Sequence, residues 1–510
     1  MAAPNRSEKL QEVFTDQLVH WGLGGNRKEV QDVVAGLLRN IDPARGWGGP
    51  GRSKAAAILE SAHREVLLKY YKLSPDHARS LATALVMWEV ITAAKEDSPH
   101  LRDEEISLVD VEGLSATRRR RILFVVGEWL PRNGGISTFN VALAGVLAQT
   151  HQVASYLPSA SDDDRQAAAA AGVTLFPSEP SDFLEDLSAQ LLVQVPQALK
   201  DFGPELVVGH DRRTGGIAIE LCDRHFPEAR SCVIAHTAPH AIERLKTDRK
   251  STNERAAEAK QRADKLSRIL RQADHAFAVG PRLKRKLSQV TGPSCTINVL
   301  TPGATILDKP APSGKQRFIL LFGRAEDAAL KGVDLAHDVA RTLEARFSNT
   351  YEWTIRGVPD KELPAFIERY PNFGLSEGYT PDPKAIEDII ARASLIVMPS
   401  LEEGFGLVAL EAIGHNRPVL ISAESGVAEY LKAICPDDAK HFVVSTRDLS
   451  SSTPDERLVI ENWVEAIERT FNNWESTMAK LQRIRNALSE SGGWKGAEIE
   501  FLAGCFPIQA

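Results

Sequence analysis

The sequence alternates between short apolar segments and helix-like segments from about residue 121 to residue 444, and this alternation constrains the fold more than any other feature. Short continuous apolar runs are typical of strands that are buried on both faces of a parallel sheet. The expected strands are RILFVV, HQVASYL, VTLFP, ELVVGH, SCVIAH, HAFAVG and TINVL, followed by FILLF, YEWTIRG, NFGLSEGY, LIVMPS, PVLIS and HFVV. Helical segments separate most of them, so we expect an α/β protein with doubly wound parallel sheets.

A segment rich in Pro and Gly, residues 301–316, divides this alternation into two series and has the composition of an interdomain hinge. We therefore expect two facing Rossmann-like lobes, residues 121–305 and 306–475, followed by a helical segment, residues 476–510, that returns to the first lobe. The carboxyl ends of parallel strands face a crevice, so two such lobes are expected to form one central cleft.

Residues 1–105 differ from the rest because their apolar residues recur at helical spacing and no strand pattern is convincing. An all-α bundle is predicted here, joined to the lobes by a charged linker, residues 106–120. Small helical domains that are fused to enzymes commonly contact other proteins, so a protein partner is expected for this bundle.

Charge and apolar content exclude some classes of function. The formal net charge of −7 argues against a nucleic-acid partner, which usually needs a basic face. The five cysteines form no C-x-x-C pair, so neither a disulfide framework nor a zinc site is expected. No signal-peptide pattern and no long apolar stretch is present, which predicts a cytoplasmic protein without an integral membrane segment.

The strongest candidate site is the segment PSLEEGFGLVALEAIGHNRPVLIS, residues 399–422. A buried strand ends in a loop with Gly404 and Gly406, where a helix begins. Backbone N–H groups at a helix start, with no Cβ atom to keep a ligand away, can bind phosphate or sugar oxygens. Glu403 in the loop and Glu411 about two turns along the helix could contact a sugar and a ribose. The alternative is an ordinary strand-to-helix turn with two solvated glutamates.

A second candidate is the pair of cations in LFGRAEDAALKGVDLA, residues 321–336. Arg324 follows a predicted strand and Lys331 precedes a predicted helix, so both could bind a diphosphate whose charge grows during bond cleavage. From these residues alone, ion pairs on the surface are the favoured interpretation. No aspartate-rich metal motif follows a strand, so no metal ion is expected.

A glycine pair, Gly134 and Gly135, lies between the first strand and its helix, where a loop can approach a ligand closely. The dinucleotide fingerprint G-x-G-x-x-G is absent, and a plain turn is the alternative. Two histidines follow buried strands: His236, for which a structural role is the more common one, and His210. With Arg212 nearby, His210 could line the acceptor side of a cleft.

The string EGFGLVALE resembles the hallmark of the retaining GT-B glycosyltransferases of family 4 (glycosyltransferase group 1), in which seven residues separate two glutamates. Here these are Glu403 and Glu411, and the likeness extends over most of residues 120–500. The resemblance implies that Glu403 contacts the donor sugar and that Glu411 contacts the ribose hydroxyls.

The same resemblance implies roles for the other candidates. Arg324 and Lys331 would bind the donor pyrophosphate, and the loop with Gly134 and Gly135 would lie over the donor phosphate. His236 would lie close to the transferred sugar. The rest of the implied donor site is the loop and helix start after Glu403, which contains Gly404, Phe405, Gly406 and Leu407.

Three positions depart from the family pattern. Thr237 stands where the family has an acidic neighbour of the histidine, and Gly280 stands where it has a serine. Asn416 occupies the place of a glycine, and asparagine tolerates the left-handed backbone conformation better than most residues.

The resemblance implies, and we therefore expect, a retaining, metal-independent enzyme that moves a hexose from a nucleotide diphosphate sugar, of the UDP or GDP type, to a hydroxyl acceptor. No cofactor is expected. In the family scheme the departing phosphate helps to deprotonate the acceptor, so the protein contributes positioning and electrostatics. The alternative is a sugar-nucleotide sensor with a GT-B fold, whose helical domain recruits a partner.

Overall fold

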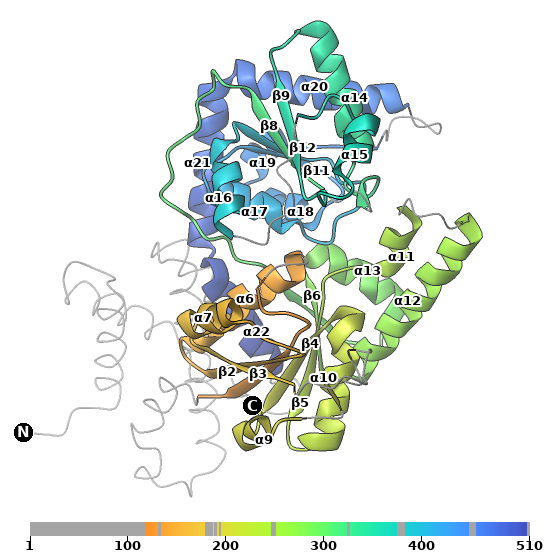
Figure 1. Cartoon of the computed structure of the whole chain (residues 1–510), viewed down its shortest axis with the longest axis vertical. Coiled ribbons are helices and arrows are strands. Elements are labelled where there is room, and N and C mark those ends of the chain that lie inside the picture. The colour runs from red at the N-terminus through yellow and green to blue at the C-terminus, as the bar shows by residue number, and fades with distance from the viewer. Residues whose placement is uncertain are drawn as a thin grey trace, which may run out of the picture. The chain divides into compact units, whose positions relative to one another are not determined.

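The computed structural model describes residues 119–130, 134–178, 187, 191–192, 195–245, 251–323, 327–374, 383–447 and 455–506 (Figure 1). The predicted helical bundle, residues 1–105, lies outside these residues, as does most of the predicted linker. The described residues belong to one compact unit. Among them, no helix combines the length and the apolar character needed to cross a membrane.

Seven parallel strands form the sheet of the first lobe, in the order β3-β2-β1-β4-β5-β6-β7. They are β1 (Arg121–Val125), β2 (Gln152–Leu157), β3 (Val173–Pro177), β4 (Leu206–His210), β5 (Arg230–Ala235), β6 (His275–Val279) and β7 (Ile297–Leu300). The strand order changes direction between β1 and β4. A ligand of such a sheet binds outside the carboxyl ends of the strands at this switch point.

Five parallel strands form the sheet of the second lobe, in the order β12-β11-β10-β8-β9, with its switch point between β8 and β10. They are β8 (Phe318–Phe322), β9 (Glu352–Arg356), β10 (Leu395–Met398), β11 (Val419–Ser422) and β12 (Val443–Val444). The expected strand NFGLSEGY is wrong in its described part, where only an isolated bridge joins Thr354 and Gly374. Residues 375–382 of that region lie outside the described residues.

Helices cover both faces of the two sheets (Figure 1). In the first lobe they are α6 (Gly135–Ala148), α7 (Asp162–Ala170), α9 (Gln197–Phe202), α10 (Asp211–His225), α11 (Pro239–Ile242), the 3₁₀ turn η1 (Glu243–Leu245), α12 (Thr252–Gln272) and α13 (Pro281–Thr291). The second lobe has α14 (Val333–Arg346), α15 (Leu363–Arg369), α16 (Pro383–Arg392), α17 (Leu407–Gly414), α18 (Gly426–Ile434), α19 (Pro436–Phe442) and α20 (Glu456–Asn472).

Strand β1 shows why the apolar runs are continuous. Ile122 and Phe124 belong to one buried cluster, whereas Leu123 and Val125 belong to another on the opposite face of the sheet. Successive side chains of a strand point to opposite faces, so burial on both faces requires apolar residues at every position. The doubly wound arrangement expected from the sequence is therefore confirmed.

The last two helices connect the lobes. Helix α21 (Trp474–Glu490) packs on α17, α18 and α19, and α22 (Gly493–Cys505) packs on α6 and β7 of the first lobe (Figure 1). Phe501 of α22 lies against the rings of Phe124 and Phe277. The chain thus crosses from the second lobe back to the core of the first.

Arg485 of α21 fastens this crossing, because its buried guanidinium binds backbone carbonyl groups of two other segments. It donates to Gly414 at 2.8 Å, to Ile413, and, at 2.8 Å, to Leu307 in the segment between β7 and β8. Carbonyl groups at the end of a helix have no partner within the helix, and α17 ends at Gly414.

Arg485→Met should therefore lower the free energy of unfolding by about 3 kcal/mol, because it leaves three carbonyl oxygens without their charged donor. The exposed Gln482 lies on the same helix, and Gln482→Met is the matched control, with an expected change within about 0.5 kcal/mol. Urea titration followed by circular dichroism measures both. Equal midpoints for the two variants would contradict the assignment.

Candidate functional site

The predicted site residues lie in loops at the carboxyl ends of strands next to the two switch points. Lys331 lies between β8 and α14, and Glu403 lies between β10 and α17. In the first lobe, His210 is the last residue of β4 and His236 follows β5. Since β8 pairs with β10, and β4 pairs with β5, each lobe brings two of its loops together.

Lys331 and Glu403 form an ion pair. The Lys331 Nζ atom donates to Glu403 Oε2 at 2.6 Å, and the side chains are 33% and 18% exposed. Ser400 donates to the same carboxylate oxygen at 3.4 Å. The pair therefore combines a cation with a carboxylate in partial contact with solvent, where polar ligand groups can compete for both.

Glu411 extends this site along α17. Burial raises the pKa of its carboxyl group. Among the residues that the structure describes, none donates a hydrogen bond to that carboxylate or forms an ion pair with it. Burying a carboxylate without a partner costs free energy, and such groups occur more often at functional sites than elsewhere.

The loop after Glu403 meets the first lobe. A Cβ atom at Gly404 would overlap the carbonyl oxygen of His236, so only a glycine allows this approach. The start of α17 is also close to the predicted glycine pair, because a Cβ atom at Gly135 would lie 3.7 Å from Leu407 Cδ1. The structure therefore brings residues of the predicted donor loop next to two of the first-lobe candidates.

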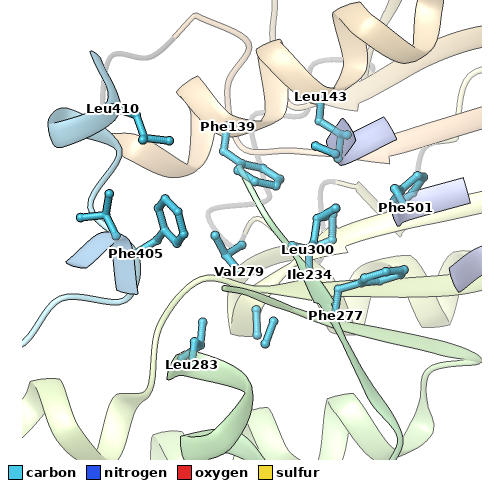
Figure 2. Close-up of a cluster of buried hydrophobic side chains, with 14 of the residues drawn as sticks. Phe139, Leu143, Ile234, Phe277, Val279, Leu283, Leu300, Phe405, Leu410 and Phe501 are labelled. Carbon is cyan, nitrogen blue, oxygen red and sulfur yellow. The ribbon is translucent and has the colours of Figure 1, made fainter. Parts of the chain in front are cut away.

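Phe405 anchors the same loop in a hydrophobic core that both lobes share. Figure 2 shows Phe405 and Leu410, from the second lobe, in one buried cluster with Phe139 and Val279 from the first. A Cβ atom at Gly280 would lie 2.7 Å from Phe405 Cδ2. The glycine that replaces the family's serine at position 280 thus leaves room for the ring.

Gly134, Gly406 and Asn416 have positive φ angles, which glycine and asparagine adopt more readily than other residues. Gly134 precedes α6 with φ 126°, and Gly406 precedes α17 with φ 103°. Asn416 has φ 59°, which is the left-handed conformation that the sequence analysis expected of it. Each of these residues ends or begins a helix, where a change of chain direction is needed.

The two histidines are joined in a chain of hydrogen bonds. His210 Nδ1 lies 3.0 Å from His236 Nε2, and His210 Nε2 lies 3.1 Å from Asn140 Oδ1. With the Asn140 amide placed so that its oxygen faces His210, that oxygen accepts from His210 Nε2, and His210 Nδ1 accepts from His236. In this arrangement each neutral ring carries its proton on Nε2.

Burial keeps these rings neutral. It lowers the pKa of His210 to about 4. Burial, together with the neighbouring His210, also holds the pKa of His236 well below its usual value. Both imidazoles are therefore uncharged at neutral pH and can act as hydrogen-bonding groups, but not as cations.

Asp211 supplies the acidic neighbour that position 237 lacks. Its Oδ1 accepts from the backbone N–H of His236 at 2.9 Å, and its Oδ2 accepts from Thr237 Oγ1 at 3.3 Å. Burial raises the pKa of this carboxyl group to about 6. The carboxylate beside the histidine thus comes from the first residue of α10, directly after β4, and not from the residue after His236.

Of the two predicted site arginines, only Arg212 lies among the described residues. Arg212 is partly buried on α10, and burial followed by the charge of Arg262 lowers its pKa. Arg324 lies outside the described residues.

Sequence reasoning missed Asn140 and Asp211. Asn140 is fully buried on α6, and a polar residue on the apolar face of a predicted helix is a signal that could have identified it. Asp211 directly follows His210, but its contact with His236 depends on the pairing of β4 with β5, which the sequence pattern alone does not specify.

The histidine pair makes a direct prediction for nuclear magnetic resonance. With histidine labelled at ¹³Cε1, the His210 signal should not titrate between about pH 8 and about pH 5, because its pKa is lowered to about 4. His236 should behave in the same way. The spectrum of His210→Gln assigns the first signal, and a titration midpoint near the ordinary histidine value for either ring would contradict the lowered pKa of that ring.

Comparison with known proteins assigns this arrangement to a family. The model of the family described as "Family 4 Glycosyltransferase in conflict systems" matches residues 123–500. Among curated proteins, the chain is 27% identical over 186 residues to D-inositol 3-phosphate glycosyltransferase of Paenarthrobacter aurescens strain TC1, which covers 35% of this chain and 40% of that protein. The chain thus spans less than half of the length of the curated relatives that it matches.

Solved structures show the same fold. Sucrose-phosphate synthase from Thermosynechococcus elongatus has a TM-score of 0.56 at 16% identity and covers 75% of this chain and 97% of its own. An Anabaena protein in complex with UDP and glucose has a TM-score of 0.54 at 14% identity, over 75% of this chain and 98% of its own. The GT-B architecture of two Rossmann-like lobes is therefore confirmed.

Proposed function

We propose that this chain, which belongs to the family 4 glycosyltransferases in conflict systems, transfers a sugar from a nucleotide sugar to a hydroxyl group of an acceptor. The observation that carries the proposal is the ion pair of Lys331 and Glu403 next to the junction of the lobes, where Gly404 meets His236. A cation and a carboxylate at a switch point suit a donor that has both a diphosphate and sugar hydroxyls.

On the donor side, Lys331 and Arg324 would bind the diphosphate, and the start of α17 would offer its unpaired N–H groups. Glu403 would accept from a sugar hydroxyl, and Glu411 from the ribose hydroxyls. The carboxylate of Glu411 has no described partner that would have to be displaced. The Anabaena structure with UDP and glucose supports a donor of this class, and we propose a hexose on a UDP or GDP carrier.

On the acceptor side, the neutral ring of His236 would hydrogen-bond with the transferred sugar, while His210 and Arg212 would line the approach of the acceptor. We propose transfer with retention of configuration. The bond from the sugar C1 to the donor phosphate breaks and the bond from C1 to the acceptor oxygen forms. The proton of the acceptor hydroxyl moves to the departing phosphate, whose growing charge Lys331 and Arg324 stabilise without a metal ion.

A donor screen tests the proposal. Purified full-length protein should show a higher melting temperature with one or more nucleotide sugars, because a ligand that binds only the folded state stabilises it.

Lys331→Met should lower transfer by about 100-fold, since it removes a cation that stabilises developing charge. Glu411→Gln should raise KM for the donor more than it changes kcat, because it removes ribose contacts away from the reacting bond.

The matched controls lie in the same lobe on exposed positions. Lys432→Met and Glu465→Gln change the same residue types without touching the proposed site, and both should transfer like the wild type. The anomeric configuration of the product, read from its proton coupling, tests retention separately. A wild-type chain that binds no nucleotide sugar and transfers none overturns the proposal.

A further inference from the structure

Helix α13 of the first lobe forms ion pairs with glutamates of the second lobe. Arg282 contacts Glu424 at 2.7 Å, and Glu402 and Glu429 at 3.4 Å each. Arg285 contacts Glu429 at 2.6 Å, and Lys286 contacts Glu402. We refer to Arg282, Arg285, Lys286, Glu402, Glu424 and Glu429 as the α13 ion cluster.

Arg282 is the centre of this cluster because it alone contacts all three glutamates. Its partners come from three segments: the loop after β10, the loop after β11, and helix α18. The side chain of Arg282 is only 14% exposed, and those of Glu402 and Glu424 are 6% and 14% exposed. Charges with so little access to water are stable only when they are paired, and loss of Arg282 takes the shared partner from all three glutamates.

The α13 ion cluster holds the loop that carries the proposed donor residues. Glu402 is the neighbour of Glu403 in the chain, and the backbone N–H of Glu403 donates to the carbonyl oxygen of Glu424 at 3.1 Å. Arg282 therefore contacts two segments of the donor loop region. One is the loop after β10, which contains Glu403, and the other is the loop after β11, whose Glu424 accepts the N–H of Glu403.

Other charges near the cluster come from the second lobe itself. Arg447 lies 3.9 Å from Glu402 and 3.7 Å from Glu424, and it is about half exposed. It can partly neutralise these glutamates, but it cannot connect them to the first lobe, because it belongs to the same lobe as they do. Only the three cations of α13 make that connection within the cluster.

We propose that Arg282 is a positioning residue, which fastens the donor loop of the second lobe to the first lobe and so holds Glu403 next to His236. Its consequence for sugar transfer rests on the proposed function. Its mechanical role does not, because it concerns only the attachment of one loop to one helix. An ordinary surface ion pair would be more exposed, as Arg346 and Glu461 are at 40% and 43%, and would contribute little.

Hydrogen exchange measured by mass spectrometry on the full chain tests the attachment directly. The amides of Leu401, Glu403 and Val427 donate to backbone carbonyls around this loop. In Arg282→Gln, peptides that cover residues 399–406 and 423–429 should exchange about tenfold faster, because local opening becomes easier. Arg346→Gln removes an ion pair of equal length, 2.7 Å, and is the matched control that should leave these peptides unchanged.

Turnover tests the consequence for transfer. Arg282→Gln should lower kcat by about tenfold or more, with a smaller change in donor affinity, because the donor residues stay within the second lobe. Glu424→Gln should have a similar but smaller effect, and the double variant should lose no more than Arg282→Gln alone, since Glu424 acts through its contact with Arg282. Arg282→Lys keeps the positive charge but loses the several N–H donors of the guanidinium group, so its kcat should lie between those of the wild type and Arg282→Gln. This milder variant also serves as a control in case Arg282→Gln does not fold.

The two results separate the two hypotheses. Unchanged exchange at residues 399–406 in a folded Arg282→Gln overturns the positioning role, as does a kcat within about twofold of the wild type. A wild-type chain without any transfer, in which Arg282→Gln still accelerates exchange, overturns the proposed function and leaves the attachment supported.

Discussion

The site depends on a close approach of two backbones, in which Gly404 lies against the carbonyl oxygen of His236. Any side chain at position 404 would push the loop after β10 away from the loop after β5. Glu403 and His236 would then separate, because each is the neighbour of the contact or a part of it. This contact between the two lobes therefore requires a glycine at position 404. The residues around it stabilise the contact.

Three different interactions support this junction. Phe405 fills a core that both lobes share, where Gly280 leaves room for its ring. The α13 ion cluster adds ion pairs between the two lobes. Arg485 binds the carbonyl groups at the end of α17 and at Leu307. Apolar burial contributes affinity without direction, whereas the charged contacts specify which loop meets which helix, so the combination gives both strength and register.

The sequence predicts the strands and the loop positions well, because each depends on local pattern. Lys331 and Glu403 could be foreseen as neighbours, since the ends of parallel strands at a switch point lie at one edge of the sheet. The partners of Asn140, Asp211 and Arg282 could not be foreseen, because they are set by tertiary pairing between segments far apart in the chain. Of the expected strand NFGLSEGY only residues 372–374 are described, and there Gly374 forms a single bridge to Thr354 and no strand.

The electrostatics of the two lobes suggest a division of chemical roles. The first lobe presents His236 and His210 as neutral rings at neutral pH, because burial lowers the pKa of each. A neutral ring that donates its Nε2–H to another ring can hydrogen-bond with a sugar but supplies no positive charge. Under the proposed function, Lys331 of the second lobe would supply fixed positive charge for the diphosphate. In the proposed transfer with retention, a departing phosphate held there would take the proton of the acceptor.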